Sequence, residues 1–154
     1  MREFFFAIKP INEFAPMLSK RCKYALKAMV CLAEIYQKGH ITTAAIAERE
    51  RIPKKFLEQI LLELKRAKLV NSKQGTGGGY YLMKPPSEVS LADLYRIFDG
   101  PIALAPCVSI NYYEKCDDCE DEASCYLRKQ FTEIRDKMRL SMMEATLEAF
   151  LKDK

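Results

Sequence analysis

Residues 42–68 read TTAAIAERERIPKKFLEQILLELKRAK, and the way this stretch divides into two helices decides the fold. Thr42 or Thr43 is a suitable N-cap for a short helix that ends near Arg49. Pro53 suits the start of a second helix over residues 54–68. Four apolar residues recur on one face of that helix: Leu57, Ile60, Leu61 and Leu64. Two helices joined by so short a turn predict a helix-turn-helix, whose second helix enters the major groove of DNA.

The next residues, LVNSKQGTGGGYYLM (69–83), contain two β-prone runs around a glycine-rich turn. They predict a β-hairpin in which residues 69–74 pair with residues 80–83. A hairpin directly after a recognition-type helix is the wing of a winged-helix domain. A phosphate-binding loop is the other interpretation of these glycines, but neither a helix start nor a Gly-Lys-Ser/Thr ending follows them.

Further helices are predicted on both sides of this unit. Apolar residues recur at helical spacing over residues 18–36, and Ser90 caps a short helix over residues 91–98. Over residues 124–150 apolar residues stay near one helical face, without proline or glycine. We expect this long helix to pair with its copy in a homodimer, because a small domain offers it few partners. The fold class is therefore mainly α with a small β-hairpin: a winged helix-turn-helix domain plus a long C-terminal dimerisation helix.

Charge divides the chain into three parts. Residues 1–16 carry no net charge and show no clear period, so we interpret them as an N-terminal extension. Residues 17–86, the winged helix-turn-helix domain, carry 14 Lys and Arg against 5 Asp and Glu. Residues 87–154, the cysteine loop and dimerisation helix, carry 9 against 14. This asymmetry suits a module that faces phosphates joined to one that stays off them, although a charged surface without a nucleic-acid role remains the alternative.

The composition is that of a globular protein, with 49% apolar and 30% charged residues in a chain of 154. The early apolar run FFFAI (4–8) is closed by Lys9 and Pro10. It is far shorter than the roughly 18 residues of a membrane span, and it makes a poor signal sequence. We expect a cytoplasmic protein that does not bind membranes.

Four of the six cysteines lie close together in sequence: Cys107, Cys116, Cys119 and Cys125. Soft thiolates bind iron–sulfur clusters or zinc, and this spacing does not choose between them. His40, the one histidine, is far away in sequence. Negative charge from neighbouring carboxylates disfavours free thiolates, and a bound metal or a disulfide would relieve this repulsion. The acidic neighbours are Asp117, Asp118, Glu120, Asp121 and Glu122. Exposed cysteines without any ligand are the remaining alternative.

The other two cysteines, Cys22 and Cys31, fall within the predicted first helix. We expect them to be buried as small apolar residues, since free cysteine is among the most buried residue types.

These elements, in this order, resemble the winged-helix iron–sulfur-cluster regulators of the IscR, NsrR and CymR type. The resemblance covers nearly everything from Met17 onward. It rests on KYAL (23–26), IAER (46–49), FLEQIL (56–61), the wing from LV (69–70) to GGGY (77–80), PP (85–86), and DGP (99–101) with the cysteines that follow.

The resemblance implies a homodimeric transcriptional regulator that binds double-stranded DNA and acts as a repressor. It implies no catalytic activity. It also implies that a cysteine-ligated iron–sulfur cluster senses redox, iron–sulfur or nitric-oxide status. A regulator of the same kind switched by a disulfide or by zinc, without iron, is the main alternative. A metal-thiolate electron carrier or thiol enzyme is the alternative of another class, and it is disfavoured because no adjacent His or Asp activates a cysteine.

The resemblance further implies which residues meet DNA. Lys55 and Glu58 are candidates for contacts with base edges in the major groove. The other candidates, for the DNA backbone or the bases, are Lys54, Gln59, Ser72, Lys73, Gln74 and Thr76. Many family members have arginine in the wing at the position of Gln74, so Lys73 is the nearest cation left for the minor groove.

Cluster-binding members use three cysteines, which match Cys107, Cys119 and Cys125 best. Some members have a histidine as fourth ligand where this chain has Arg128, which is not a ligand. Two hypotheses follow for a 2Fe-2S or 4Fe-4S cluster: Cys116 supplies the fourth thiolate, or the partner subunit supplies the fourth ligand.

Overall fold

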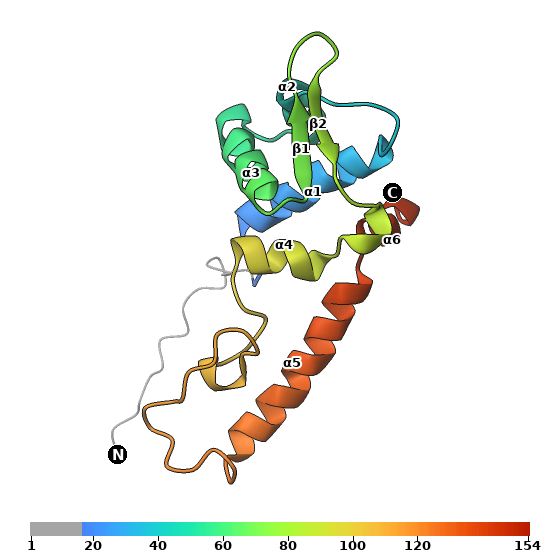
Figure 1. The fold of residues 1–154 in the computed structure, drawn as a ribbon. Coiled ribbons are helices and arrows are strands. Elements are labelled where there is room, and N and C mark those ends of the chain that lie inside the picture. The colour runs from blue at the N-terminus through green and yellow to red at the C-terminus, as the bar shows by residue number, and fades with distance from the viewer. Residues whose placement is uncertain (1–16) are drawn as a thin grey trace, which may run out of the picture.

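A computed structural model describes residues 17–154, which form helices and one two-stranded antiparallel hairpin that projects from one end of the molecule (Figure 1). The elements in chain order are α1 (Lys20–Glu34), α2 (Thr43–Glu50), α3 (Lys54–Arg66), β1 (Val70–Lys73), β2 (Gly79–Leu82), the 3-10 turn η1 (Pro86–Glu88), α4 (Leu91–Phe98), the 3-10 turn η2 (Pro106–Val108), α5 (Tyr126–Glu144) and α6 (Leu147–Lys152). The predicted extension, residues 1–16 with its apolar run, lies outside the described residues. Among the helices of residues 17–154, none is long and apolar enough to cross a membrane.

The predicted helix-turn-helix is confirmed. The Thr42 side chain accepts a hydrogen bond from the Ala45 N–H at 3.2 Å and so caps α2. Arg51 ends α2 in the left-handed conformation, with φ of 53°. Ile52 then turns inward and is 4% exposed, so its side chain anchors the three-residue turn to the core. The helix α3 begins directly after Pro53. The helix α3 ends at Arg66, two residues earlier than predicted.

The apolar stripe of α3 is fully buried, at 0% exposure for each residue: Leu57, Ile60, Leu61 and Leu64. It packs into one core with α1, whose buried face includes the small residues Ala25 and Ala28. Cys22 and Cys31 are also at 0% exposure in that core, as expected of small apolar residues. Burial of the stripe fixes the rotation of α3 about its axis, so the opposite face of this helix must point to solvent.

The wing, which we define as residues 70–82, pairs Val70 with Leu82 and Lys73 with Gly79. A third segment, unforeseen from the sequence, joins it: Ile41 and Tyr80 exchange backbone hydrogen bonds of 2.8 and 3.1 Å. A Cβ atom on Gly79, which has φ of +144°, would stand 2.5 Å from the Ile41 carbonyl oxygen. Glycine therefore allows the wing to reach the segment that precedes α2.

The single C-terminal helix predicted over residues 124–150 is wrong in one respect, because the structure divides it. The helix α5 ends at Glu144, and Thr146 caps the separate helix α6. The break is held by backbone pairing with a distant segment, since the Leu91 N–H donates to the Ala145 carbonyl at 2.8 Å and the Leu147 N–H donates to the Val89 carbonyl at 2.9 Å. Leu147 is fully buried, so α6 returns to pack on α1.

The helix α4 connects the two ends of the molecule. Ser90 and Asp93 form a reciprocal capping box at its start, as predicted from Ser90. The helix contacts α1 on one side and α5 on the other, and α5 extends away from the winged-helix end (Figure 1). The residues between α4 and α5, 101–125, form the cysteine loop, which lies beside the outer half of α5.

Candidate nucleic-acid interface and cysteine loop

The structure brings the four candidate DNA contacts of α3 onto one exposed face. Lys54, Lys55, Glu58 and Gln59 are all exposed, on the side of α3 away from its buried stripe. We call these four residues the outer face of α3. An exposed helix face that combines cations with a carboxylate and an amide has the donors and acceptors needed to read base edges.

A contact between α3 and the wing involves a residue that was not among the predicted site residues. The Lys65 Nζ atom donates a hydrogen bond of 2.7 Å to the Ser72 Oγ atom in β1. The predicted contact residue Ser72 is therefore already bonded to α3 and half-buried. Lys65 stands seven residues after Glu58, so helical periodicity alone was a signal that could have found it.

The tip of the wing is exposed and turns tightly. Lys73, Gln74 and Thr76 are exposed, and the Gly78 N–H donates to the Gly75 carbonyl at 3.0 Å. Lys73 is the single charged residue between positions 70 and 82. Any electrostatic attraction between the wing and a phosphate backbone therefore depends on Lys73.

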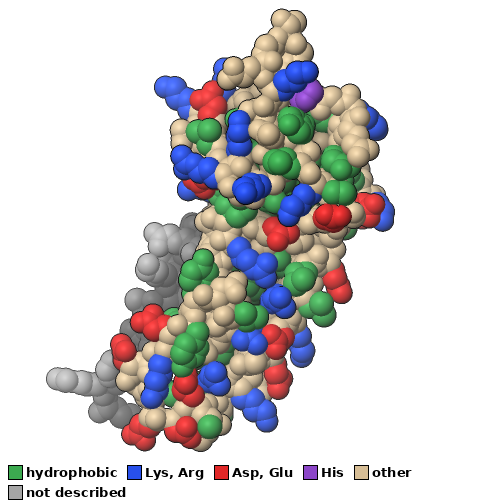
Figure 2. Space-filling view, viewed as in Figure 1, with side chains coloured by type: hydrophobic (Ala, Val, Ile, Leu, Met, Phe, Trp, Pro, Cys, Tyr) green, Lys and Arg blue, Asp and Glu red, His purple; other side chains and the backbone are tan. Residues whose placement is uncertain are grey.

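Charge is distributed unevenly along the molecule. Figure 2 shows Lys and Arg side chains spread over the winged-helix end of this view, and many Asp and Glu side chains at the opposite end. The acidic end includes the exposed residues Asp117, Asp118 and Glu120 of the cysteine loop. A polyanion is attracted to the first end and repelled by the second.

The four thiols of the cysteine loop differ in exposure and influence one another. Cys107 is 7% exposed in η2, whereas Cys116, Cys119 and Cys125 are half-buried. A hydrogen bond with Cys107, together with burial, raises the pKa of Cys116 to about 11. Burial, then the charge and hydrogen bond of Cys125, raise the pKa of Cys119. The charge of Cys119 also raises the pKa of Cys116, so each of the four thiols is influenced by, or influences, another thiol of the loop.

Arg128 holds this loop against α5. Its Nε atom donates to the Cys107 carbonyl at 3.4 Å and lies 3.8 Å from a Glu122 carboxylate oxygen. The Tyr113 hydroxyl donates to the same carboxylate at 2.7 and 2.8 Å, a bond that raises the pKa of Tyr113. Arg128 is thus a tether between the two ends of the loop.

The donors of the cysteine loop decide whether a metal or cluster fits it. Within residues 17–154, no three His, Cys, Asp or Glu side chains stand close enough together to hold a metal ion. The chemistry of the donors does fit a metal or an iron–sulfur cluster, since four thiols are available. The Cys125 sulfur also accepts a hydrogen bond from the Arg128 backbone N–H at 3.4 Å, at the start of α5, where a helix favours the negative charge of a thiolate. Joint binding by all four thiols therefore requires the thiols to move closer together.

Comparison with known proteins agrees with this architecture. A family model described as "Rrf2: Iron-dependent Transcriptional regulator" matches residues 18–153. The "Putative HTH-type transcriptional regulator rrf2-like" of Rhodobacter capsulatus is 47% identical over 121 residues, which cover 77% of this chain and 81% of that protein. The HTH-type transcriptional regulator IscR of Photorhabdus laumondii is 28% identical over 131 residues, which cover 85% of this chain and 76% of that protein.

Solved structures have the same fold. CymR (YrzC), the global cysteine regulator of B. subtilis, superposes with a TM-score of 0.73 at 29% identity, over 88% of this chain and 96% of that one. IscR of T. potens superposes with a TM-score of 0.67 at 24% identity, over 88% of this chain and 85% of that one, and so supports the fold alone.

Proposed function

Because this chain belongs to the Rrf2 family of transcriptional regulators, we propose that it binds DNA as a homodimer and represses transcription according to the state of its loop cysteines. The observation that carries this proposal is the arrangement of the outer face of α3 beside the wing, at the basic end of the molecule. In this proposal Lys55 and Glu58 contact base edges in the major groove, and Lys54 and Gln59 contact the bases or the backbone.

In this proposal the wing contributes less to DNA affinity than a wing with an arginine at its tip would, because this wing has Gln74 there. Lys73 approaches the minor groove or its phosphates, while Gln74 and Thr76 offer hydrogen bonds without charge. Ser72 acts with Lys65 as one unit, because the two are already bonded across α3 and β1. We therefore expect most sequence discrimination to come from α3.

Dimerisation through α5 is supported by the apolar residues that remain exposed on this helix. Leu127 is 48% exposed and Ile134 is 45% exposed, they lie seven residues apart on one face, and α5 has no fully buried residue. A 19-residue helix with so little cover is better explained by a partner helix than by solvent. Two copies then present two recognition helices to two half-sites.

The cysteines carry the sensing step. Cys107, Cys116, Cys119 and Cys125 would hold an iron–sulfur cluster, which when bound supplies one-electron redox chemistry and reactivity toward oxidants or nitric oxide. The loop connects α4, which packs on the winged helix, to α5. Tightening or releasing the loop therefore alters how α5 is set against the DNA-binding end.

A thiol switch without iron is the second candidate, and it is supported by the mutual influence of the loop thiols. In this proposal a peroxide-type oxidant takes two electrons from two of the thiols and forms a disulfide, with Cys107–Cys116 and Cys119–Cys125 as the candidate pairs. The raised pKa values of Cys116 and Cys119 keep these two largely as thiols at neutral pH, which slows this reaction.

The DNA-binding claim is tested by titrating the full-length protein against promoter fragments at several salt concentrations. We expect affinity to fall steeply with salt, and Glu58→Ala to lose sequence discrimination while the affinity for nonspecific DNA is kept. Lys129→Ala removes one exposed positive charge from the side of α5 opposite Leu127 and Ile134, at the end of the molecule away from α3, and serves as the control. A DNA affinity that does not change with salt concentration, together with unchanged sequence discrimination in Glu58→Ala, would refute the proposal.

The sensing claim is tested separately, by anaerobic purification with iron and sulfide analysis and a visible spectrum. Bound iron and sulfide that Cys116→Ser reduces would identify Cys116 as a ligand, whereas a colourless protein with disulfides would favour the thiol switch. Cys31→Ala alters a core cysteine outside the loop and is the matched control. DNA affinity that stays the same under reducing and oxidising conditions, in the presence of all four loop cysteines, would exclude both forms of sensing.

A further inference from the structure

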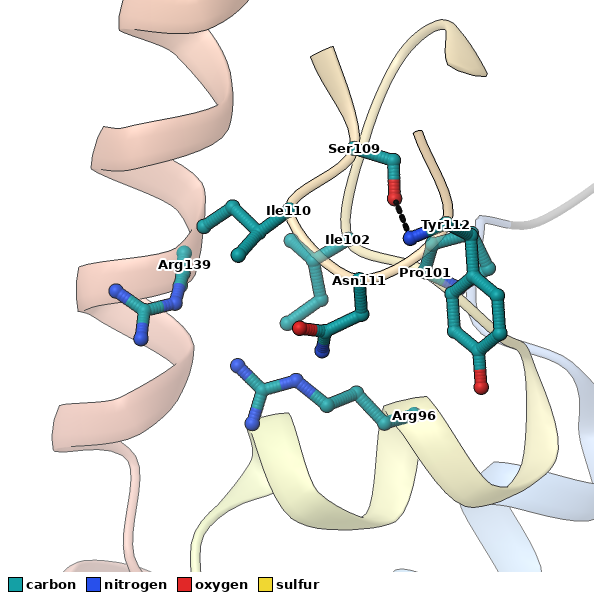
Figure 3. Close-up of a pocket in the computed structure, with 8 residues that line it drawn as sticks. All are labelled: Arg96, Pro101, Ile102, Ser109, Ile110, Asn111, Tyr112 and Arg139. Atoms are coloured by element: carbon teal, nitrogen blue, oxygen red, sulfur yellow. Dashed lines mark hydrogen bonds between the residues drawn. The ribbon is translucent and has the colours of Figure 1, made fainter. Parts of the chain in front are cut away.

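A small hollow lies where α4, α5 and the cysteine loop meet. It has a volume of about 50 Å³ and is bordered by residues of all three segments, among them Arg96 on α4, Arg139 on α5 and Asn111 on the loop (Figure 3). Since a single water needs roughly 10–15 Å³, the hollow holds about as much as three to five waters. It is thus the size of a small polyatomic ion.

The polar lining of the hollow is dominated by positive charge. Figure 3 shows the Arg96 guanidinium reaching from α4 toward α5, below the side-chain amide of Asn111, with Arg139 on the α5 side. Arg96 has one carboxylate near it, that of Asp93 on its own helix, at 3.9 Å. Arg139 has no ion-pair partner among residues 17–154.

Neighbouring arginines on α5 differ from Arg139 in this respect. Arg135, one turn earlier, donates to the Val108 carbonyl at 2.6 Å and pairs with Asp136 at 2.7 Å. Arg128 is engaged by Glu122 and the Cys107 carbonyl. Both of these arginines have acceptors within the protein, whereas the described residues provide no hydrogen-bond or ion-pair acceptor for Arg139.

The rest of the lining limits what can enter. Ile102, Ile110 and Tyr112 supply apolar walls, and the Ser109 hydroxyl is already bonded to the Tyr112 N–H at 3.0 Å. No side-chain nitrogen or oxygen buried within the described residues lacks a partner, so the guanidinium groups remain open to solvent. A ligand can therefore reach them by displacing water.

We propose that this hollow binds a small oxyanion, with Arg96 and Arg139 as its charged ligands and Asn111 as a neutral hydrogen-bond donor. Guanidinium groups match tetrahedral and planar oxyanions because their N–H donors form a fork, and charge-assisted bonds of this kind are stronger than neutral ones. Two like charges from separate helices repel each other, and an anion between them removes that repulsion. This proposal does not depend on DNA binding or on the state of the cysteines.

The test follows the Nε–H signals of Arg96 and Arg139 by nuclear magnetic resonance in the full-length protein, titrated with sodium sulfate, phosphate or acetate at constant ionic strength. We expect saturable shifts of both signals with at least one of these anions, and none with chloride. Sulfate or phosphate alone would identify a tetrahedral ligand, and acetate alone a carboxylate.

Variants decide whether those shifts report this site. Arg139→Met should weaken binding about tenfold or more, because one charge-assisted partner is lost, and Asn111→Ala should weaken it less. Arg139→Lys keeps the charge without the fork and should fall between the wild type and Arg139→Met. Lys129→Met removes the same charge from an exposed position of α5 ten residues from Arg139 and should bind as the wild type does.

Two results would overturn the proposal. One is the absence of a saturable shift at Arg96 and Arg139 with all three oxyanions. The other is an equal response of Arg139→Met and the wild type, with the fold of the variant confirmed by its amide spectrum, because the anion would then be bound elsewhere.

Discussion

The Nζ atom of Lys65 in α3 and the Oγ atom of Ser72 in β1 are 2.7 Å apart and hydrogen-bonded, so the recognition helix and the wing are joined by their side chains. This contact places a cation between the two elements proposed to meet DNA. Because both residues belong to elements adjacent in sequence, the angle between α3 and the wing is a local property of the winged helix.

Lys65→Met should weaken DNA binding and lower the slope of log affinity against log salt concentration by about 1, as expected for the loss of one phosphate contact. Fluorescence anisotropy with a labelled promoter fragment at several salt concentrations gives that slope. Lys129→Met is the charge-matched control, on the side of α5 opposite Leu127 and Ile134. An unchanged slope in Lys65→Met would show that this lysine serves the wing alone.

Gly79→Ala should destabilise the protein by about 3 kcal/mol or more, because its Cβ would stand 2.5 Å from the Ile41 carbonyl at a φ that favours glycine. Gly77→Ala is a matched control in the same turn, with φ of +75° and no atom within 4 Å of the added Cβ. It should cost only about 1 kcal/mol, from backbone strain. Urea denaturation measures both, and equal losses would argue against close approach of the wing and Ile41.

Leu147→Ala should lower the free energy of unfolding by roughly 2–5 kcal/mol, because Leu147 is fully buried and anchors α6 against α1. Leu140→Ala removes the same atoms from a residue of α5 that is 58% exposed. It should change stability by about 0.5 kcal/mol or less. If both variants behaved alike in thermal and urea unfolding, one uninterrupted C-terminal helix free of the core would be the better description.

Glu34→Gln should destabilise the protein at neutral pH by roughly 0.5–1 kcal/mol, the range of a partly exposed ion pair. Burial acts to raise the pKa of Glu34, but hydrogen bonds from Lys154 and Arg49 outweigh it and lower the pKa. The stabilisation is therefore present above the unfolded-state pKa and is lost as pH falls through the folded-state pKa.

The difference between the wild type and Glu34→Gln should accordingly vanish in acid, which urea unfolding at a series of pH values from neutral down to about 3 measures. Glu148→Gln breaks an exposed pair with Lys152 at 3.5 Å and is the control, with a smaller effect at every pH. A Glu34→Gln difference that grows toward low pH would contradict a lowered pKa for Glu34 in the folded protein.

The predicted helix starts were accurate where the signal is local. Thr42 caps α2, and Ser90 with Asp93 caps α4, because a capping side chain reaches only two or three residues along the chain. The stripe of α3 and the wing were found for the same reason, since their periodicity needs no distant partner. The exposed positions of Lys54, Lys55, Glu58 and Gln59 followed from that stripe.

The division between α5 and α6 was not predicted, because it depends on residues far apart in sequence. Nothing in residues 124–150 breaks a helix locally, yet Ala145 and Leu147 form backbone hydrogen bonds with Leu91 and Val89. The pairing of Ile41 with Tyr80 was missed for the same reason.

The sequence by itself thus determined the winged helix-turn-helix, its charged outer face and the presence of four loop thiols, since helix periodicity, capping and turn chemistry act over a few residues. Only the tertiary structure decided that Arg128 tethers the loop and that α6 folds back onto the core. Those features arise from contacts between segments brought together by burial, and burial depends on the whole chain at once.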